Sequence, residues 1–341
     1  MPLPLILGVG ATVAGAAGVG SGIHGAVKMK NANEVMKTAK ERHEANLNRF
    51  EKENVFTSEK MDKLGRLELK ILQSFSTFSD IFEQIKNRPS FAAYSKNGIT
   101  LPQYDGEKLK EVSIGAGVLL GGLGGAAVGT AGGFAAAGAT TAAVMALGTA
   151  STGTAIASLS GAALTNATLA ALGGGSLVVG GGGIALGTMV LNAATLGAGL
   201  LVGGIIFNFT GRKLSDKAEE AWSQMEEAET KINKICTYLS ELRATANGYY
   251  ATLNAANKIY EKHLEKLKYI VLNFKHRDWD RFTKDEQKTT ENTVLLVELL
   301  YNMCKVELVL KNECENDMNI INTSGITNSV NNANTILAEY F

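Results

Sequence analysis

Few residues in this chain have types and spacing that could support chemistry. Gly20, Gly22 and Gly25 match the GxGxxG string of dinucleotide-binding loops. No strand is predicted before them, however, and a glycine-rich stretch produces this match by chance. The four histidines are not at metal-ligand spacing; they are His24, His43, His263 and His276. Neither a nucleotide site nor a metal site is predicted.

Carboxylates and thiols give no stronger signal. Asp278 and Asp280 flank Trp279 in a polar turn, which is more typical of a helix cap than of an acid/base pair. Cys236, Cys304 and Cys314 are odd in number and widely spaced, so we expect reduced cysteines rather than a disulfide framework or a zinc site. We therefore expect a protein that is not an enzyme and uses no cofactor.

The distribution of charge is the most informative feature. The 33 basic residues balance the 33 acidic residues, which gives no indication of a nucleic-acid partner. From Val112 to Gly211, about 100 residues, there is no Asp, Glu, Lys, Arg or His, where average usage would supply roughly 25 charged residues. We call this stretch the uncharged block. It favours an environment other than water.

Glycines recur at every fourth position near the start of this block. Glycine in a water-exposed helix costs about 0.5–1 kcal/mol relative to alanine, whereas in lipid a row of small residues lets two helices approach closely. The spacing predicts a glycine zipper, and we expect further packing positions along the block. The predicted zipper is Gly117, Gly121, Gly125, Gly129 and Gly133, and the further positions are Gly161, Gly187, Gly199, Gly203 and Phe207.

Segment lengths agree with membrane insertion, because about 20 helical residues cross a bilayer. The block divides into residues 112–139, 140–172 and 184–209, with a glycine hinge at 173–183, and 184–209 is the strongest candidate to span. Charged residues close both ends, and if the flanking helices form one bundle, both ends lie on the same side of the membrane and the number of crossings is even, two being preferred and four compatible. The alternative is that these helices pack inside a soluble form that precedes insertion.

The first 28 residues are also apolar and glycine-rich. They lack the positive segment of a secretory signal, since Lys28 follows the apolar part. Small residues recur by sevens and place packing positions on one helix face, at Gly8, Gly15, Gly18, Gly22 and Gly25. We expect this helix to meet another helix closely.

Long helices flank the block. Residues 29–106 predict a helix to about Arg88, with Leu64, Ile71, Phe78 and Ile85 at heptad spacing beside Phe75 and Phe82, then a connector and a new helix near Glu107. Residues 212–275 carry the most regular heptads, and only His263 departs from apolarity. The packing positions expected there are Ile232, Leu239, Leu253, Tyr260 and Leu267.

The C-terminal segment, residues 276–341, begins with a break. Thr283 and Glu286 have capping-box spacing, so we expect a helix from there to about Asn319 and a further short helix in the asparagine-rich tail. No strand-type alternation stands out anywhere. The predicted fold is all-α: an elongated bundle of long coiled-coil-like helices with a central Gly/Ala-rich apolar insert at 107–211.

This arrangement resembles the α-helical pore-forming toxins of the cytolysin A and tripartite haemolysin type, in architecture alone. The run from Ser151 to Leu191 is similar to bacterial glycine-zipper proteins and, more loosely, to apolipoprotein L. The resemblance implies a membrane-associated homo-oligomer, with or without related helical components, that perforates or remodels a bilayer. The alternative is a non-enzymatic, membrane-anchored scaffold whose long helices assemble other proteins.

Overall fold

The computed structural model describes eight parts of the chain, which are residues 32–91, 95–96, 98–101, 103–123, 130–136, 138–147, 214–310 and 318–341. These parts are mostly helical, and the all-α prediction is confirmed. The chain divides into two compact units. Unit 1 comprises Met1–Thr57, Thr195–Leu242 and Cys314–Met318, and unit 2 comprises Ser58–Ala194, Arg243–Glu313 and Asn319–Phe341. Two long helices, α3 (Ala32–Phe82) and α10 (Leu214–Lys268), contribute to both units.

Unit 1 is held together by apolar residues of these two helices. Ile232 and Leu239 of α10 are buried, and Leu47 and Phe50 of α3 pack against them. The Thr57 hydroxyl donates a hydrogen bond to the Leu239 carbonyl oxygen at 3.0 Å. The predicted heptad positions of α10 therefore form the core of this unit.

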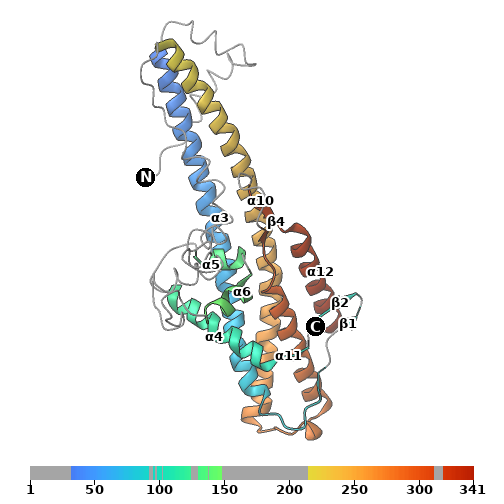
Figure 1. Cartoon of the computed structure of the whole chain (residues 1–341). Helices are drawn as coiled ribbons and strands as arrows, with labels where there is room; N and C mark the ends of the chain where they lie inside the picture. The colour runs from blue at the N-terminus through green and yellow to red at the C-terminus, as the bar shows by residue number, and fades with distance from the viewer. Residues whose placement is uncertain are drawn as a thin grey trace, which may run out of the picture. The chain divides into compact units, whose positions relative to one another are not determined.

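Unit 2 is a helical bundle in which the later parts of α3 and α10 are joined by α11 (Lys284–Met303) and α12 (Thr323–Tyr340) (Figure 1). Its core contains the predicted seam of α3, and the Phe75 ring meets the Tyr260 ring edge-on at 6.1 Å. The predicted core positions that are buried here are Leu64, Ile71, Phe75, Phe78, Phe82, Ile85, Leu253, Tyr260 and Leu267. The heptad prediction is confirmed for both helices.

Three described helices belong to the uncharged block or lead into it: α4 (Gly106–Leu123), α5 (Thr130–Ala136) and α6 (Ala139–Met145). The start of α4 matches the helix predicted near Glu107. Gly138, at φ +83°, separates α5 from α6 close to the predicted boundary at 139–140. Within the described residues, no helix has both the length and the apolar composition needed to cross a bilayer.

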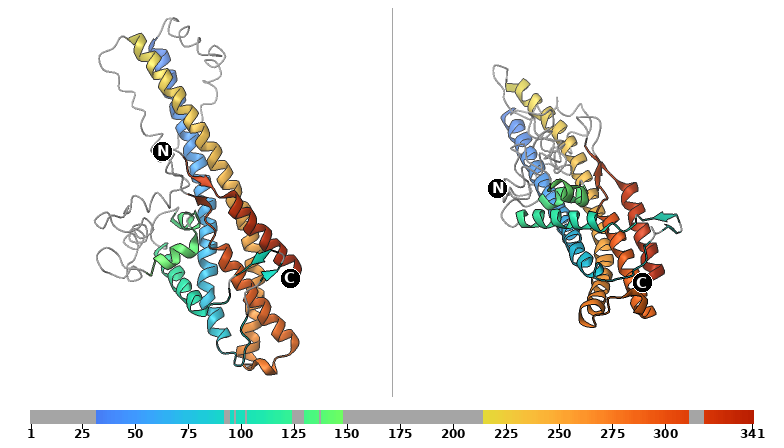
Figure 2. Two further views of the ribbon diagram at one scale, coloured as in Figure 1. Left: turned by 45° about the vertical axis from the view of Figure 1, so that its right-hand side comes forward. Right: turned by 60° about the horizontal axis from the view of Figure 1, so that its bottom comes forward.

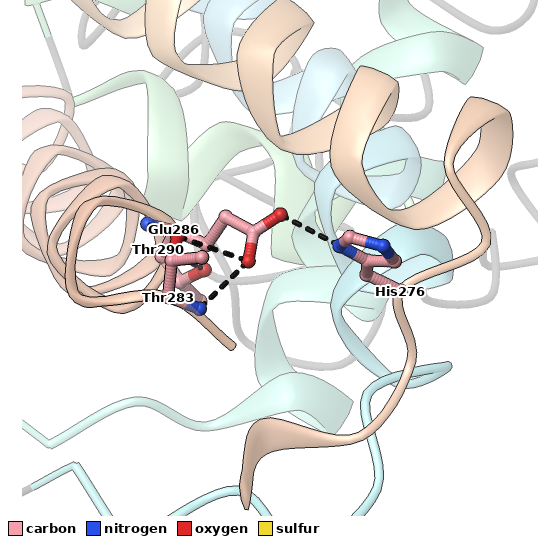
Figure 3. Close-up of polar contacts among 4 residues, drawn as sticks. All are labelled: His276, Thr283, Glu286 and Thr290. Carbon is pink, nitrogen blue, oxygen red and sulfur yellow. Dashed lines mark hydrogen bonds and ion pairs between the residues drawn. The ribbon is translucent and has the colours of Figure 1, made fainter. Parts of the chain in front are cut away.

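The predicted capping box at the start of α11 is confirmed. The Thr283 hydroxyl accepts a hydrogen bond from the Glu286 amide, and the Glu286 carboxylate accepts one from the Thr283 amide at 2.8 Å (Figure 3). The box satisfies amide groups that the first helical turn leaves without partners.

The expected end of this helix near Asn319 is wrong. α11 ends at Met303, and Val309–Leu310 (β3) pairs antiparallel with Ile320–Ile321 (β4). Three of these four residues are β-branched and favour the extended backbone. A second short ladder joins Ser95–Lys96 (β1) to Ile99–Thr100 (β2), so the expectation of no strands fails at these two places.

Candidate functional site

The candidate site lies in unit 2, where α4, α5 and α6 dock against the bundle (Figures 1 and 2). The closest approach joins α5 to α3. A Cβ atom added to Gly65 of α3 would lie 1.8 Å from the Ala131 carbonyl oxygen, and one added to Gly132 would lie 2.8 Å from the Met61 Cβ. Backbone meets backbone at this crossing, which only a residue without a side chain allows.

α4 meets α6 at another glycine, Gly115. A Cβ at Gly115 would lie 1.9 Å from the Ala143 carbonyl oxygen. On the α3 side, the Ser113 hydroxyl donates to the Gln73 carbonyl oxygen at 2.5 Å and accepts from the Ser76 amide at 3.2 Å. One serine thus links α4 to the backbone of α3 through two hydrogen bonds.

The start of α6 meets the end of α11. The Thr140 amide donates a hydrogen bond to the Cys304 carbonyl oxygen at 3.1 Å. A Cβ at Gly138 would lie 2.9 Å from the Lys305 carbonyl oxygen. A helix N-terminus with free amides therefore faces a helix C-terminus with free carbonyls, which satisfies groups at both ends.

The buried side chains of this docked layer are mostly small. Leu109, Val112, Leu119 and Phe134 are larger, whereas the others are chiefly alanines: Ala116, Ala131, Ala135, Ala136, Ala139, Ala142, Ala143 and Ala146. Hydrophobic stabilisation scales with the apolar area removed from water, at about 25 cal/mol per Å², and an alanine removes little. Docking depends on close backbone approach more than on large side chains.

A buried carboxylic acid lies next to the glycine crossing. Glu68, one helical turn after Gly65, is fully buried, and neither carboxyl oxygen has a hydrogen-bond partner among the described residues. Burial raises its pKa well above the ordinary value, because a dry environment disfavours the charged carboxylate. The Cys304 thiol lies 3.9 Å from the Glu68 carbonyl oxygen, and burial followed by the Glu68 charge raises the pKa of that thiol.

A second acid lies on α11. Glu298 is 6 % exposed, and burial raises its pKa to about 8, with a hydrogen bond from the Tyr104 backbone opposing the shift. Tyr104 precedes α4, so the carboxyl lies beneath the segment that leads into the uncharged block. Its protonation is linked to whether that segment stays in place.

The predicted glycine zipper is only partly described. Gly117 lies beside the Gln73 side chain, with 3.3 Å from a Cβ position to Nε2, and Gly121 is exposed, with no atom of the described residues within 4 Å of its Cβ position. Gly133 is buried in α5. The remaining positions lie outside the described residues: Gly125, Gly129, Gly161, Gly187, Gly199, Gly203, Phe207, and in the N-terminal segment Gly8, Gly15, Gly18, Gly22 and Gly25.

The close contacts use glycines that the spacing argument missed. Gly115, Gly132 and Gly138 are not on the i, i+4 row that begins at Gly117. Gly65 had a usable signal, because it is the single glycine in the 51-residue helix α3. The sequence also contained a signal for Glu68. This residue lies seven positions before Phe75, so the heptad pattern places a carboxylate at a core position.

Other chemistry is not assembled in the described parts of the chain. No group of three or more His, Cys, Asp or Glu side chains with metal-binding geometry occurs among the described residues. His276 contacts the Glu286 carboxylate through Nδ1 at 2.7 Å, which ties it to the capping box (Figure 3). No family model matches the sequence, and no curated protein or solved structure is detectably similar to it.

Proposed function

We propose that this chain is a membrane-inserting, oligomerising helical protein that perforates or remodels a lipid bilayer, and that the docked α4–α6 layer is its form before insertion. The observation that carries the proposal is the uncharged block itself, about 100 residues without an ionisable side chain. Water does not favour such a stretch, and the block carries none of the charged side chains whose transfer into hydrocarbon costs most.

The docked contacts support a reversible attachment. They consist of glycine and alanine packing together with a few backbone hydrogen bonds, such as Thr140 to Cys304. A helix that leaves this layer keeps its internal hydrogen bonds, and its small residues are suited to close helix contacts in lipid. Gly121 faces no atom of the described residues in the docked form, which suits it to contact a second copy of the chain.

The scaffold alternative has one observation in its favour. Val55 and Phe56 of α3 are exposed large apolar residues in unit 1, and Phe56 is 51 % exposed. A partner protein could cover them. The heptad rows do not add to this argument, because they are buried within the chain.

Release of a trapped dye from liposomes tests the proposal. Purified protein should release dye, and replacing Gly121, Gly125 and Gly129 with leucine should abolish release or oligomers, because bulky side chains block helix approach. Gly248→Leu is the matched control, since Gly248 is also an exposed helical glycine with open space around it. Binding without release would favour the scaffold, and unchanged release by the triple variant would contradict the zipper.

A further inference from the structure

The turn between α10 and α11 exposes a cluster of large apolar side chains. α10 passes into a π-helix, η3 (Tyr269–Asn273), before the chain turns toward α11. Tyr269 is 53 % exposed, Leu272 37 % and Phe274 57 %. The Tyr269 and Phe274 rings meet edge-on with centroids 4.8 Å apart. Apolar groups that gather in this way, rather than singly, indicate an interaction surface.

The turn is held in one conformation by its own backbone. The Phe274 amide donates to the Tyr269 carbonyl oxygen and the His276 amide to the Ile270 carbonyl oxygen, each at 3.1 Å. The Arg277 side chain donates to the Val271 carbonyl oxygen at 3.2 Å. Because Ile270 and Val271 are buried in the bundle, Tyr269, Leu272 and Phe274 are fixed on the outside.

Basic residues surround this cluster. Lys266, Lys268, Lys275 and Arg277 are exposed, and no acidic residue occurs between positions 266 and 277. Two neighbouring carboxylates are in ion pairs, Glu265 with Lys268 and Asp278 with Arg281, each at 3.5 Å. Glu286 contacts His276 at 2.7 Å, which is an ion pair only when the histidine is protonated. Lys266 and Lys275 form no ion pair with any described residue, so the surface around the aromatic rings is positive.

Lys275 occupies a backbone position that normally selects glycine. Its φ is +58°, and a side chain in this left-handed region costs about 1 kcal/mol. Glycine would remove that cost without changing the fold of the turn. A cation just past the C-terminus of a helix offsets part of that cost, so Lys275→Gly should change the stability of the turn little while removing a charge beside the aromatic rings.

We propose that residues 266–277, the basic–aromatic turn, bind the surface of an anionic lipid bilayer. This rests on the proposed function and gives the chain a first contact with the membrane that is separate from the uncharged block. Aromatic rings prefer the interfacial region of a bilayer, and lysines beside them are attracted to anionic headgroups. Burial of the rings and attraction of the lysines add together, as for other amphipathic surface segments.

A lipid surface fits better than an acidic protein partner because the apolar side chains project together with flexible lysines, whose stems can lie along hydrocarbon while the ammonium groups reach headgroups. Phe56 provides the contrast within the same chain. It is similarly exposed, but residues 51–60 contain three glutamates and two lysines. An anionic membrane would not attract that surface.

Flotation of the full-length protein with vesicles tests the inference. Wild type should float with phosphatidylcholine vesicles that contain phosphatidylglycerol and float less with phosphatidylcholine alone. Phe274→Ser should weaken binding about tenfold through lost ring burial, and Phe56→Ser should leave it unchanged. Lys275→Gly should weaken binding about fivefold on anionic vesicles only, with no loss of thermal stability.

The outcomes separate this inference from the proposed function. If Phe274→Ser and Lys275→Gly bind anionic vesicles as wild type does, or if Phe56→Ser weakens binding equally, the basic–aromatic turn is not the docking surface, whatever the dye-release result. If wild type floats in a Phe274-dependent manner without releasing dye, the inference stands and perforation fails. If wild type floated as well with phosphatidylcholine vesicles as with anionic vesicles, the inference would also be overturned, because the lysines would then have no role in binding.

Discussion

Two glycine-to-alanine substitutions should change stability in opposite directions. Gly65 and Gly248 each lie inside a long helix of unit 2, and an alanine there gains about 0.5–1 kcal/mol of helix propensity. At Gly248 nothing lies within 4 Å of the new Cβ, so Gly248→Ala should raise the free energy of unfolding by that amount. At Gly65 the new Cβ would lie 1.8 Å from the Ala131 carbonyl oxygen.

The clash at Gly65 sets the size of the effect. Contacts shorter than 3.0 Å do not occur, so α5 and α3 must separate by about 1.2 Å or more. A gap of about 1 Å forfeits up to half of the dispersion energy of the atoms that line it, and overpacking of this kind costs about 1–3 kcal/mol. After the propensity gain, Gly65→Ala should lower the free energy of unfolding by about 1–2 kcal/mol.

Denaturant unfolding followed by circular dichroism measures both changes. A thiol assay reports the location, because Cys304 is buried where α6 meets α11. In a background with Cys236→Ser and Cys314→Ser, Gly65→Ala should speed reaction of Cys304 with a thiol reagent, and Gly248→Ala should not. If Gly65→Ala stabilises the protein as much as Gly248→Ala, or leaves Cys304 unreactive, α5 does not dock on α3 as described.

Three further perturbations address the acid, the cap and the heptads. Because the pKa of Glu298 is about 8 in the folded state, its protonated carboxyl contributes stability that is complete below about pH 4.5 and lost as pH rises through 8. Wild type should therefore lose on the order of 4 kcal/mol between about pH 5 and pH 9, and Glu298→Gln should lose less, by denaturant midpoints; parallel profiles would contradict this. Thr283→Ala should cost about 1 kcal/mol in the same assay through the lost cap, and no change would show that the box is not formed in solution. Leu239→Asp and Leu253→Asp place a charge in the cores of units 1 and 2 and should each cost more than about 3 kcal/mol; an unaltered melting curve would mean that the heptads are misread.

The long helices were predictable because the apolar residues that define them recur at a regular spacing within each helix. The row of apolar residues that steps by seven from Met225 to Leu267 is buried throughout, since a seven-residue repeat keeps one face of a helix against its neighbour. Phe274, the next residue of that row, is exposed because η3 and the turn have ended the α-helical register by then. The capping box was equally local, because Thr283 and Glu286 are three residues apart.

The end of α11 was not predictable from local pattern. Apolar residues continue in helical order past Met303, yet Val309–Leu310 pair with Ile320–Ile321, and the Cys304 carbonyl accepts a hydrogen bond from Thr140. Both partners are distant in the sequence from the residues that they fix. A periodic pattern within one helix carries no information about such distant partners, and the tertiary contacts override the local preference for helix.

Glycine spacing predicted that α4 has a helix-contact face but could not say which partner would use it. In the docked form Gly115 meets Ala143, whereas Gly121, on a different face of the same helix, meets no atom in the described part of the chain. Gly115 thus serves a contact within the chain, whereas Gly121 is placed to serve a contact between copies. Leucine at Gly121 should therefore act on oligomers without unfolding unit 2, and alanine at Gly65 should act on docking without touching the zipper. If both substitutions altered unfolding and dye release together, a single glycine face would serve both roles, and the docked layer could not be the form that precedes insertion.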